Sequence, residues 1–215
     1  MTFDDLERLA GCSLDPAARA AFQAYADLVT RWTQRINLVS RSTLDTLWSR
    51  HIADSAQLFP LAPPSARRFA DLGSGGGFPG IVLAILARQH RPEARFALVE
   101  SDQRKATFLR EAVRVTGVAA EILCARAEHV APLAAEVVSA RALSALPELL
   151  GLVHRHLAPN GVALLPKGAG SQAEVDAARS SWAFDVEEFP SQTSPDARLL
   201  RLQHLSRRTG SSTST

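Results

Sequence analysis

The chain has 215 residues, of which 46% are hydrophobic and 21% are charged, and its formal net charge is only +2. This length and apolar content suffice for one compact domain with a sizeable core, and they exclude disorder over most of the chain. The two cysteines lack the spacing of a metal site or a disulfide framework, and no stretch approaches the roughly 18 apolar residues of a membrane-spanning helix. We therefore expect a cytoplasmic monomer that has neither a membrane partner nor a bound metal.

The first quarter of the chain has the pattern of a helical cap. Asp15 and Pro16 are typical of a helix start, and apolar residues recur at helical spacing as far as Ile36. After a polar break at residues 37–42, a second helix is expected over 43–59, and a proline-rich linker ends it. We place this cap at residues 1–64.

Basic and aromatic side chains are interleaved in the cap. The residues concerned are Arg31, Trp32, Arg35, Arg41, Trp48 and Arg50. Such a mixture suits phosphate contacts and base stacking in nucleic-acid recognition. Two amphipathic helices with buried tryptophans and solvated arginines explain it as well, so both interpretations stay open.

From residue 67 onward strands and helices alternate, which favours a mostly parallel sheet with helices on both faces. Parallel strands are expected over 68–72, 95–99, 120–125, 137–140 and 162–165, with helices over 80–87, 106–115 and 146–157. Two further strands, over 184–189 and 199–205, suggest an antiparallel pair at the sheet edge. We place this core at residues 65–205 and predict a disordered tail, rich in serine and threonine, over 206–215.

The segment DLGSGGGFPG, from Asp71 to Gly80, joins the first expected strand to its helix. Its glycines satisfy both GxGxG and GxGxxG, and the missing Cβ atoms let a ligand approach the backbone at a helix N-terminus. Glu100 ends the second expected strand, where a nucleotide-binding βαβ unit holds a ribose. Asp71 suits the zwitterionic end of an amino acid better than a pyrophosphate. The pattern therefore favours S-adenosylmethionine over a dinucleotide.

Polar residues also follow the other expected parallel strands. Glu128 comes after the third strand, Arg141 after the fourth and Lys167 after the fifth. Each of them alone has a structural explanation, as a helix start or a solvated strand end. Because ligands in open α/β sheets bind outside the carboxyl ends of the strands, we predict that these side chains converge on one site.

His51 and Asp54 lie three residues apart on the expected second helix. They can face this site or attach the cap to the sheet, and we favour attachment.

Five segments together resemble the small-subunit ribosomal RNA methyltransferase G family, also known as glucose-inhibited division protein B. They are RINLVSRST, RHIADS, DLGSGGGFPG, VSARAL and LPKG, and the resemblance covers residues 27–205. It implies a Rossmann-like methyltransferase fold, with a seven-stranded, mostly parallel sheet that has an antiparallel edge strand. It also implies S-adenosylmethionine-dependent methylation of N7 of guanine 527 in 16S rRNA, free or within the small ribosomal subunit.

The motifs carry candidate roles onto particular positions. Cofactor contacts are expected from Asp71, Gly73, Gly75, Phe78, Glu100, Ala127, Glu128 and Arg141. Arg141 and Lys167 are the candidate catalytic residues, because either can hydrogen-bond O6 of guanine or hold a phosphate and leave N7 free. RNA contacts are expected from Arg35, Asn37, Arg41 and Lys167.

The expected chemistry needs no general base. The N7 lone pair of guanine is already nucleophilic, so alignment with the sulfonium methyl and exclusion of water suffice. Carbon-5 methylation of a pyrimidine needs a cysteine nucleophile, but Cys124 falls inside an expected buried strand and Cys12 precedes the first expected helix. Two other functions stay open: an NAD-dependent oxidoreductase, against which Asp71 argues, and a non-catalytic rRNA-binding module with a retained cofactor pocket, against which the intact glycine loop argues.

Overall fold

The computed structural model describes residues 1–208, and seven of its strands form one sheet in the order β3-β2-β1-β4-β5-β7-β6. The strands are β1 Arg68–Leu72, β2 Arg95–Val99, β3 Ala120–Leu123, β4 Ala135–Ala140, β5 Leu157–Lys167, β6 Trp182–Pro190 and β7 Arg198–Arg207. The predicted seven-stranded, mostly parallel α/β fold is confirmed.

The direction of winding changes between β1 and β4. Strands β1 to β5 run parallel to their neighbours, with β2 and β3 on one side of β1 and with β4 and β5 on the other. A crevice forms at the carboxyl ends of the strands where the order reverses in this way. Strand β7 is antiparallel to both β5 and β6. The predicted antiparallel pair is therefore present, and β7, second from the edge, is the strand that runs against the sheet.

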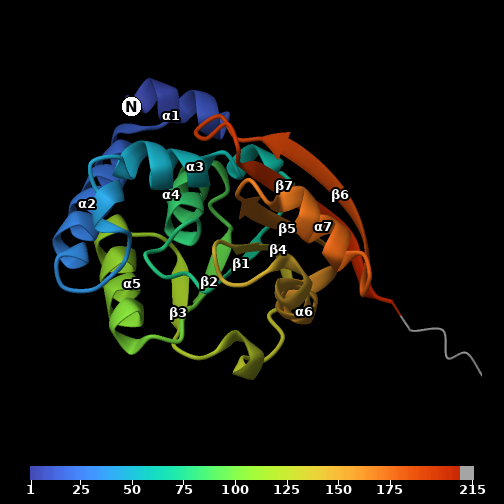
Figure 1. Ribbon diagram of the computed structural model, residues 1–215. Coiled ribbons are helices and arrows are strands. Elements are labelled where there is room, and N and C mark those ends of the chain that lie inside the picture. Colours follow the sequence, from blue (N-terminus) through green and yellow to red (C-terminus); the bar gives the residue numbers. More distant parts are fainter. Residues whose placement is uncertain (209–215) are drawn as a thin grey trace, which may run out of the picture.

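Helices cover both faces of the sheet (Figure 1). One face packs against α2 Pro16–Thr33, α4 Gly80–His90 and α5 Gln103–Thr116, and the other packs against α6 Leu146–His156 and α7 Ser171–Ala178. Alternation along the strands separates the two layers: Phe69 and Leu164 belong to the first buried cluster, whereas Ala70 and Leu165 belong to the second.

The cap contributes to the first of these clusters and has no core of its own. It consists of α1 Phe3–Ala10, α2, the short helices η1 Arg41–Thr43, η2 Trp48–Ala53 and η3 Phe59–Leu61, and the single turn α3 Asp54–Ala56. Helix α2 begins as expected, since the Asp15 carboxylate accepts from the Ala18 amide at 2.6 Å and Pro16 follows. The predicted boundary at residue 64 falls between η3 and β1.

The continuous helix expected over 43–59 is not found. Residues 48–53 form a π-helical turn between two 3-10 turns, and the Ser55 hydroxyl bonds back to the His51 carbonyl at 2.6 Å. A π turn changes the angular spacing of its side chains and is frequent at functional sites. Here it buries Ile52 and leaves His51 and Asp54 half-buried at the junction of cap and core.

The cap tryptophans serve packing. Trp32 meets Phe108 edge to face at 5.7 Å, and Trp48 meets Phe3 in the same way at 5.5 Å. Both indoles are half-buried against the core cluster. The packing interpretation is thus the one that the structure supports for these two residues.

Several element ends differ from expectation. Strand β3 ends at Leu123, so Cys124 is exposed and not buried in a strand as predicted. Helices α1 and α7 were not anticipated. Strand β7 continues to Arg207, two residues into the predicted tail, and residues 209–215 of that tail lie outside the described part. Within residues 1–208 no helix combines the length and apolar character needed to cross a bilayer.

Candidate functional site

The glycine loop between β1 and α4 needs residues without side chains for two reasons. Gly73, Gly75 and Gly77 have φ values of +67°, +55° and +85°, which side chains disfavour. A Cβ on Gly77 would lie 2.7 Å from Cγ1 of Ile81, so this glycine allows the helix to pack. A Cβ on Gly75 would meet nothing closer than the Gly73 carbonyl at 3.8 Å. Around the missing side chain of Gly75 there is thus only this one ordinary contact, and we refer to the room beside it as the open space at Gly75.

Asp71 supports this loop from inside the protein, at the end of β1. Its side chain is buried, with Oδ1 accepting from the Ser139 hydroxyl at 2.7 Å and Oδ2 accepting from the Gly80 amide at 3.2 Å. Burial raises the pKa of this carboxyl from 3.8 to about 6, although the hydrogen bonds act in the opposite direction. Asp71 therefore braces the glycine loop, and that it faces the amino acid part of a ligand stays a prediction.

Glu100 joins the end of β2 to the glycine loop. Its Oε2 accepts from the Gly75 amide at 2.8 Å, and its Oε1 accepts from the Asp102 amide at 2.8 Å. Only 8% of the residue is exposed. Because each carboxylate oxygen can accept more than one hydrogen bond, acceptor capacity remains for a pair of hydroxyl groups beside the open space at Gly75.

Arg141, at the end of β4, lies against the glycine loop and the cap. Its guanidinium sits 5.0 Å from the ring centre of Phe78, and its Nη1 lies 2.9 Å from Nδ1 of His51. The other ring nitrogen of His51 lies 2.9 Å from the Thr43 hydroxyl. Since an arginine can only donate, Nδ1 accepts, and Nε2 carries the proton and donates to Thr43.

His51 is held neutral by these surroundings. Burial, together with the charges of Arg141 and then Arg50, lowers its pKa from 6.5 to about 4. The imidazole also lies 5.2 Å from the Phe78 ring, which in turn contacts Tyr25, whose hydroxyl donates to the Gly76 carbonyl. His51 consequently attaches the cap to the core and orients Arg141. It also lines the pocket described below together with Asp54, so both alternatives left by the sequence apply.

Lys167, at the end of β5, has a carboxylate partner on α7. Its Nζ lies 2.8 Å from Oε2 of Glu174 and 3.3 Å from the Ser144 carbonyl, and its side chain is 10% exposed. The same Glu174 oxygen accepts from the Leu146 amide at 2.7 Å. Although burial alone would raise the pKa of Glu174, the lysine and this amide lower it overall. Lys167 is therefore a positioned cation and not a solvated strand end.

A pocket of about 620 Å³ opens between the cap, the segment that follows β4 and the end of β5. Arg50, His51, Asp54, Arg141, Leu143, Lys167, Glu174 and Thr193 are among the residues that line it. Leu143 also closes against the glycine loop, because a Cβ on Gly73 would come within 2.6 Å of its Cδ1. The pocket thus meets the glycine loop through Leu143 at Gly73, two residues before Gly75.

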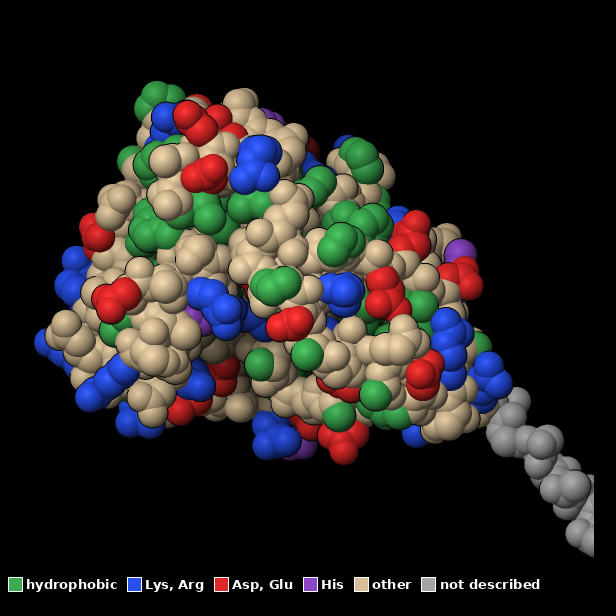
Figure 2. Space-filling model, turned by 45° about the horizontal axis from the view of Figure 1, so that its top comes forward, with side chains coloured by type: hydrophobic (Ala, Val, Ile, Leu, Met, Phe, Trp, Pro, Cys, Tyr) green, Lys and Arg blue, Asp and Glu red, His purple; other side chains and the backbone are tan. Residues whose placement is uncertain are grey.

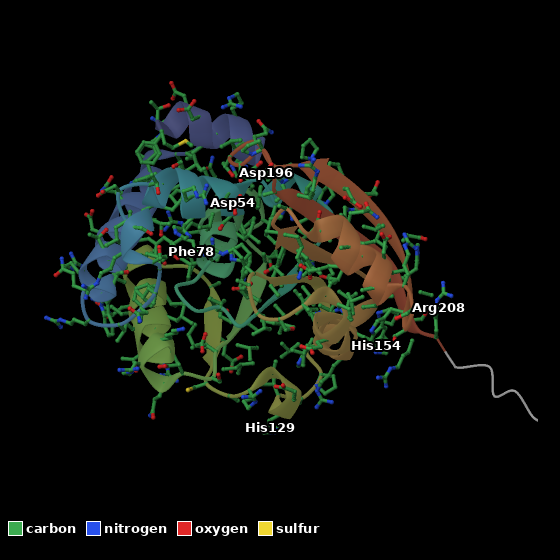
Figure 3. The ribbon with its side chains drawn as sticks, in the orientation of Figure 1. Asp54, Phe78, His129, His154, Asp196 and Arg208 are labelled. Atoms are coloured by element: carbon green, nitrogen blue, oxygen red, sulfur yellow. The ribbon has the colours of Figure 1, made fainter. Side chains whose placement is uncertain are left out.

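Other predicted site residues lie apart from this pocket. Ala127 is buried, and its carbonyl lies 2.9 Å from Nε2 of His156; Glu128 is exposed and pairs with Arg126 at 3.3 Å. Both belong to η4, Ala127–His129, beyond the end of β3. In Figure 3, His129 lies at the bottom edge of the molecule, well below Asp54. Cys124 is not among the pocket residues either.

The candidate RNA-binding residues of the cap are on the surface. Arg35, Asn37 and Arg41 are exposed and do not line the pocket, whereas Arg50 is exposed at its rim. The face of the molecule drawn in Figure 2 carries Lys and Arg side chains scattered among acidic and apolar groups, without a continuous basic field. Any contact of this surface with a polyanion would therefore be local.

Sequence reasoning missed Glu174, Thr193 and Leu143. Glu174 lies on α7, a helix that was not predicted. Thr193 lies in the loop between β6 and β7, which is far from the cap in sequence; its hydroxyl donates to Oδ1 of Asp54 in the cap at 2.7 Å. Leu143 lies only two residues after Arg141, but its exposure is visible only in the structure, so the sequence alone gave no usable signal for its place in the site.

Known proteins resemble this chain over most of its length. The family model described as rRNA small subunit methyltransferase G matches residues 18–200. A relative of that name from Cereibacter sphaeroides is 54% identical over 181 residues, which cover 84% of this chain and 88% of the relative. Another, from Rhodospirillum centenum, is 50% identical over 204 residues, covering 95% of this chain and 91% of the relative.

Solved structures that resemble this one share its fold. M. jannaschii TYW2, solved with AdoMet, has a TM-score of 0.56 and 13% identity, covering 82% of this chain and 80% of the other. The O-methyltransferase TomG from Streptomyces achromogenes, solved with SAM, has a TM-score of 0.53 and 17% identity, covering 89% and 91%. The sheet is therefore the Rossmann-like sheet of methyltransferases. By its sequence, the chain belongs to the rRNA small subunit methyltransferase G family.

Proposed function

We propose that this protein transfers a methyl group from S-adenosylmethionine to N7 of a guanine in 16S rRNA, at position 527, as the family resemblance implies. The observation that carries the proposal is the adjacency of two spaces: the open space over Gly75 and the pocket of about 620 Å³ that shares Leu143 with the glycine loop. Family membership supports ribosomal RNA as the substrate.

The residues present fit the cofactor. Gly75 leaves room above the backbone at the N-terminal end of α4, and Glu100 holds the Gly75 amide while it retains acceptor capacity for ribose hydroxyls. Gly73 and Phe78 complete the loop, and Ala127 and Glu128 follow β3, where an adenine ring would lie. Asp71 contributes by bracing the loop. When bound, S-adenosylmethionine supplies an electrophilic methyl group on a sulfonium.

Arg141 and Lys167 are the proposed catalytic side chains. Both are cations at the carboxyl ends of neighbouring strands, and both line the pocket. Each donates hydrogen bonds and neither can accept one, so they suit O6 of guanine or a phosphate oxygen and leave N7 free. His51 fixes the direction of Arg141, and Glu174 fixes that of Lys167. Alignment and exclusion of water, without a general base, are the contributions asked of the protein.

Substrate contact outside the pocket falls to the exposed cap residues Arg35, Asn37 and Arg41. We propose that they touch the RNA backbone of the small ribosomal subunit or of its free RNA, in the cytoplasm. A monomer suffices for the reaction, because the glycine loop, Arg141 and Lys167 all come from one chain.

The direct test is transfer of a labelled methyl group to small-subunit RNA, and to assembled subunits, from cells that lack the gene, followed by digestion to nucleosides. We expect the label in 7-methylguanosine, at no more than one methyl group per RNA molecule. Label in another nucleoside would refute the proposed atom, and absence of transfer to either substrate would refute the proposed function.

A further inference from the structure

Two carboxylates line the pocket among the residues that the structure describes, and each accepts hydrogen bonds on only one of its oxygens. They differ in the charge of their partners: Glu174 Oε2 is paired with the Lys167 cation and also accepts from the Leu146 amide, whereas both donors to Asp54 are neutral. Asp54 accepts from two hydroxyl groups, Thr193 at 2.7 Å and Ser191 at 3.4 Å, and both of them donate to Oδ1. No group within residues 1–208 donates to its Oδ2. Asp54 thus presents an oriented, half-buried carboxylate with one oxygen available.

The orientation of Asp54 comes from the loop between β6 and β7. Thr193 and Ser191 belong to that loop, and Gln57 holds it as well by accepting from the Gln192 amide at 2.6 Å. Figure 3 shows Asp54 close to the part of the loop that carries Asp196. Because several hydrogen bonds tie this loop to the cap, the Asp54 carboxylate is held in place before any ligand binds.

A carboxylate in a base pocket discriminates among nucleobases. Guanine alone of the four RNA bases presents two adjacent donors, N1–H and N2–H, on its Watson–Crick edge, and an ionised carboxylate only accepts. Adenine and cytosine each place a ring acceptor beside their amino group, and uracil flanks its single donor with carbonyl oxygens. A carboxylate at this edge therefore attracts guanine and repels the other bases.

The surroundings of Asp54 complement the rest of a guanine. O6 of guanine lies next to N1 and needs a hydrogen-bond donor beside the carboxylate. Arg141 is a cation that lines the same pocket. Burial lowers the pKa of Arg141, and the negative charge of Asp54 acts in the opposite direction. N7 lies on the opposite edge of guanine from N2. Arg141 and Leu143 contact the glycine loop, while Asp54 is held by the β6–β7 loop. A guanine that lies between Asp54 on one side and Arg141 and Leu143 on the other would direct N7 toward the glycine loop.

We propose that Asp54 is the specificity-determining residue of the pocket and accepts hydrogen bonds from N1–H and N2–H of the target guanine. This inference rests on the proposed function, because it concerns the base whose N7 is methylated.

The experiment compares guanosine with inosine, which lacks the N2 amino group but keeps N7. Small-subunit RNA is assembled by ligation with either nucleoside at the position that the wild-type enzyme methylates, and kcat/KM is measured for wild type and Asp54→Asn. For wild type we expect a loss of roughly tenfold to a hundredfold on inosine, as for one hydrogen bond to a charged group. For the variant we expect a comparable loss on guanosine and a guanosine-to-inosine ratio within about threefold of unity.

Thr193→Val is the matched control, since it removes one of the two hydroxyls that orient Asp54 but keeps the carboxylate; its guanosine-to-inosine ratio should fall between those of wild type and Asp54→Asn. Stabilisation of each variant by S-adenosylhomocysteine in a thermal melt reports that the fold and cofactor site survive. A wild-type enzyme that uses inosine as well as guanosine would overturn the inference without reference to any variant. A guanosine-to-inosine ratio in Asp54→Asn equal to that of wild type would also overturn it. Either result would leave the proposed function standing. Absence of wild-type methyl transfer to guanosine would overturn both.

Discussion

Replacing Gly75 by alanine separates the backbone strain of the glycine loop from its contact with a ligand. The left-handed conformation, with φ at +55°, costs a residue that has a Cβ roughly 1–2 kcal/mol. The new methyl group has no neighbour within 3.8 Å, so no packing cost is added. Since 1 kcal/mol shifts the Tm of a domain of this size by roughly 2–4 °C, we expect a decrease of about 2–8 °C.

Gly117→Ala is the matched control. Gly117 ends α5 with φ at +64°, and a Cβ there would lie 3.7 Å from Nη1 of Arg88. The backbone strain is thus the same as at Gly75, but the position is remote from the loop. Gly77→Ala gives the contrasting case: its Cβ would lie 2.7 Å from Ile81 and 2.8 Å from the Tyr25 hydroxyl, which adds an overpacking cost of roughly 1–3 kcal/mol.

Thermal melts and calorimetric titration with S-adenosylhomocysteine measure the two effects separately. Gly75→Ala and Gly117→Ala should lose similar stability, but only Gly75→Ala should lose affinity, by roughly tenfold or more, which corresponds to about 1.4 kcal/mol. If Gly75→Ala bound this ligand as tightly as Gly117→Ala, the space at Gly75 would not be the cofactor site and the loop would be only a turn.

Three further predictions concern single side chains. An NMR titration should find the His51 imidazole neutral down to pH about 4, and Arg141→Met should raise that pKa, because burial and Arg141 together disfavour the charged ring. Since the pKa of histidine in the unfolded chain is 6.5, the contribution of neutral His51 to stability is complete above that pH and is lost as the pH falls toward 4. An unchanged His51 pKa in Arg141→Met would contradict the pairing of the two side chains. Glu174→Gln removes the ionic partner of the nearly buried Lys167. The unfolding free energy measured in denaturant melts should fall by roughly 1.5–3 kcal/mol. A loss smaller than the error of the melt would show that the pair does not contribute to stability. Arg41→Glu should weaken binding to 16S rRNA, most strongly at low salt, because the loss of a phosphate contact also flattens the salt dependence. Binding of S-adenosylhomocysteine should stay intact, and unaltered RNA affinity would assign Arg41 to the solvated surface.

The parallel sheet and the glycine loop could be predicted because their signals are local. Each buried strand is a short apolar run. In DLGSGGGFPG the glycines indicate a tight turn with left-handed backbone, whatever distant segments pack around it. The acid at the end of β2 was also placed correctly beside the loop, since the ends of parallel strands meet at one edge.

What the sequence could not show depends on contacts between distant segments. Asp71 occupies the predicted strand end, but the Ser139 hydroxyl and the Gly80 amide engage its carboxylate below the loop. The partner of Lys167 lies on α7, and the hydroxyl partners of Asp54 lie 137 and 139 residues away. The helix expected over 43–59 is replaced by turns of three kinds, because packing of the cap on the core overrides helical propensity.

A crystal structure with S-adenosylhomocysteine shows whether the glycine loop seats the methyl donor next to the base pocket. We expect the ligand over Gly75, with its ribose hydroxyls on Glu100 and its sulfur directed toward the pocket lined by Arg141 and Lys167. A ligand bound elsewhere, or a sulfur separated from that pocket by protein side chains, would contradict it.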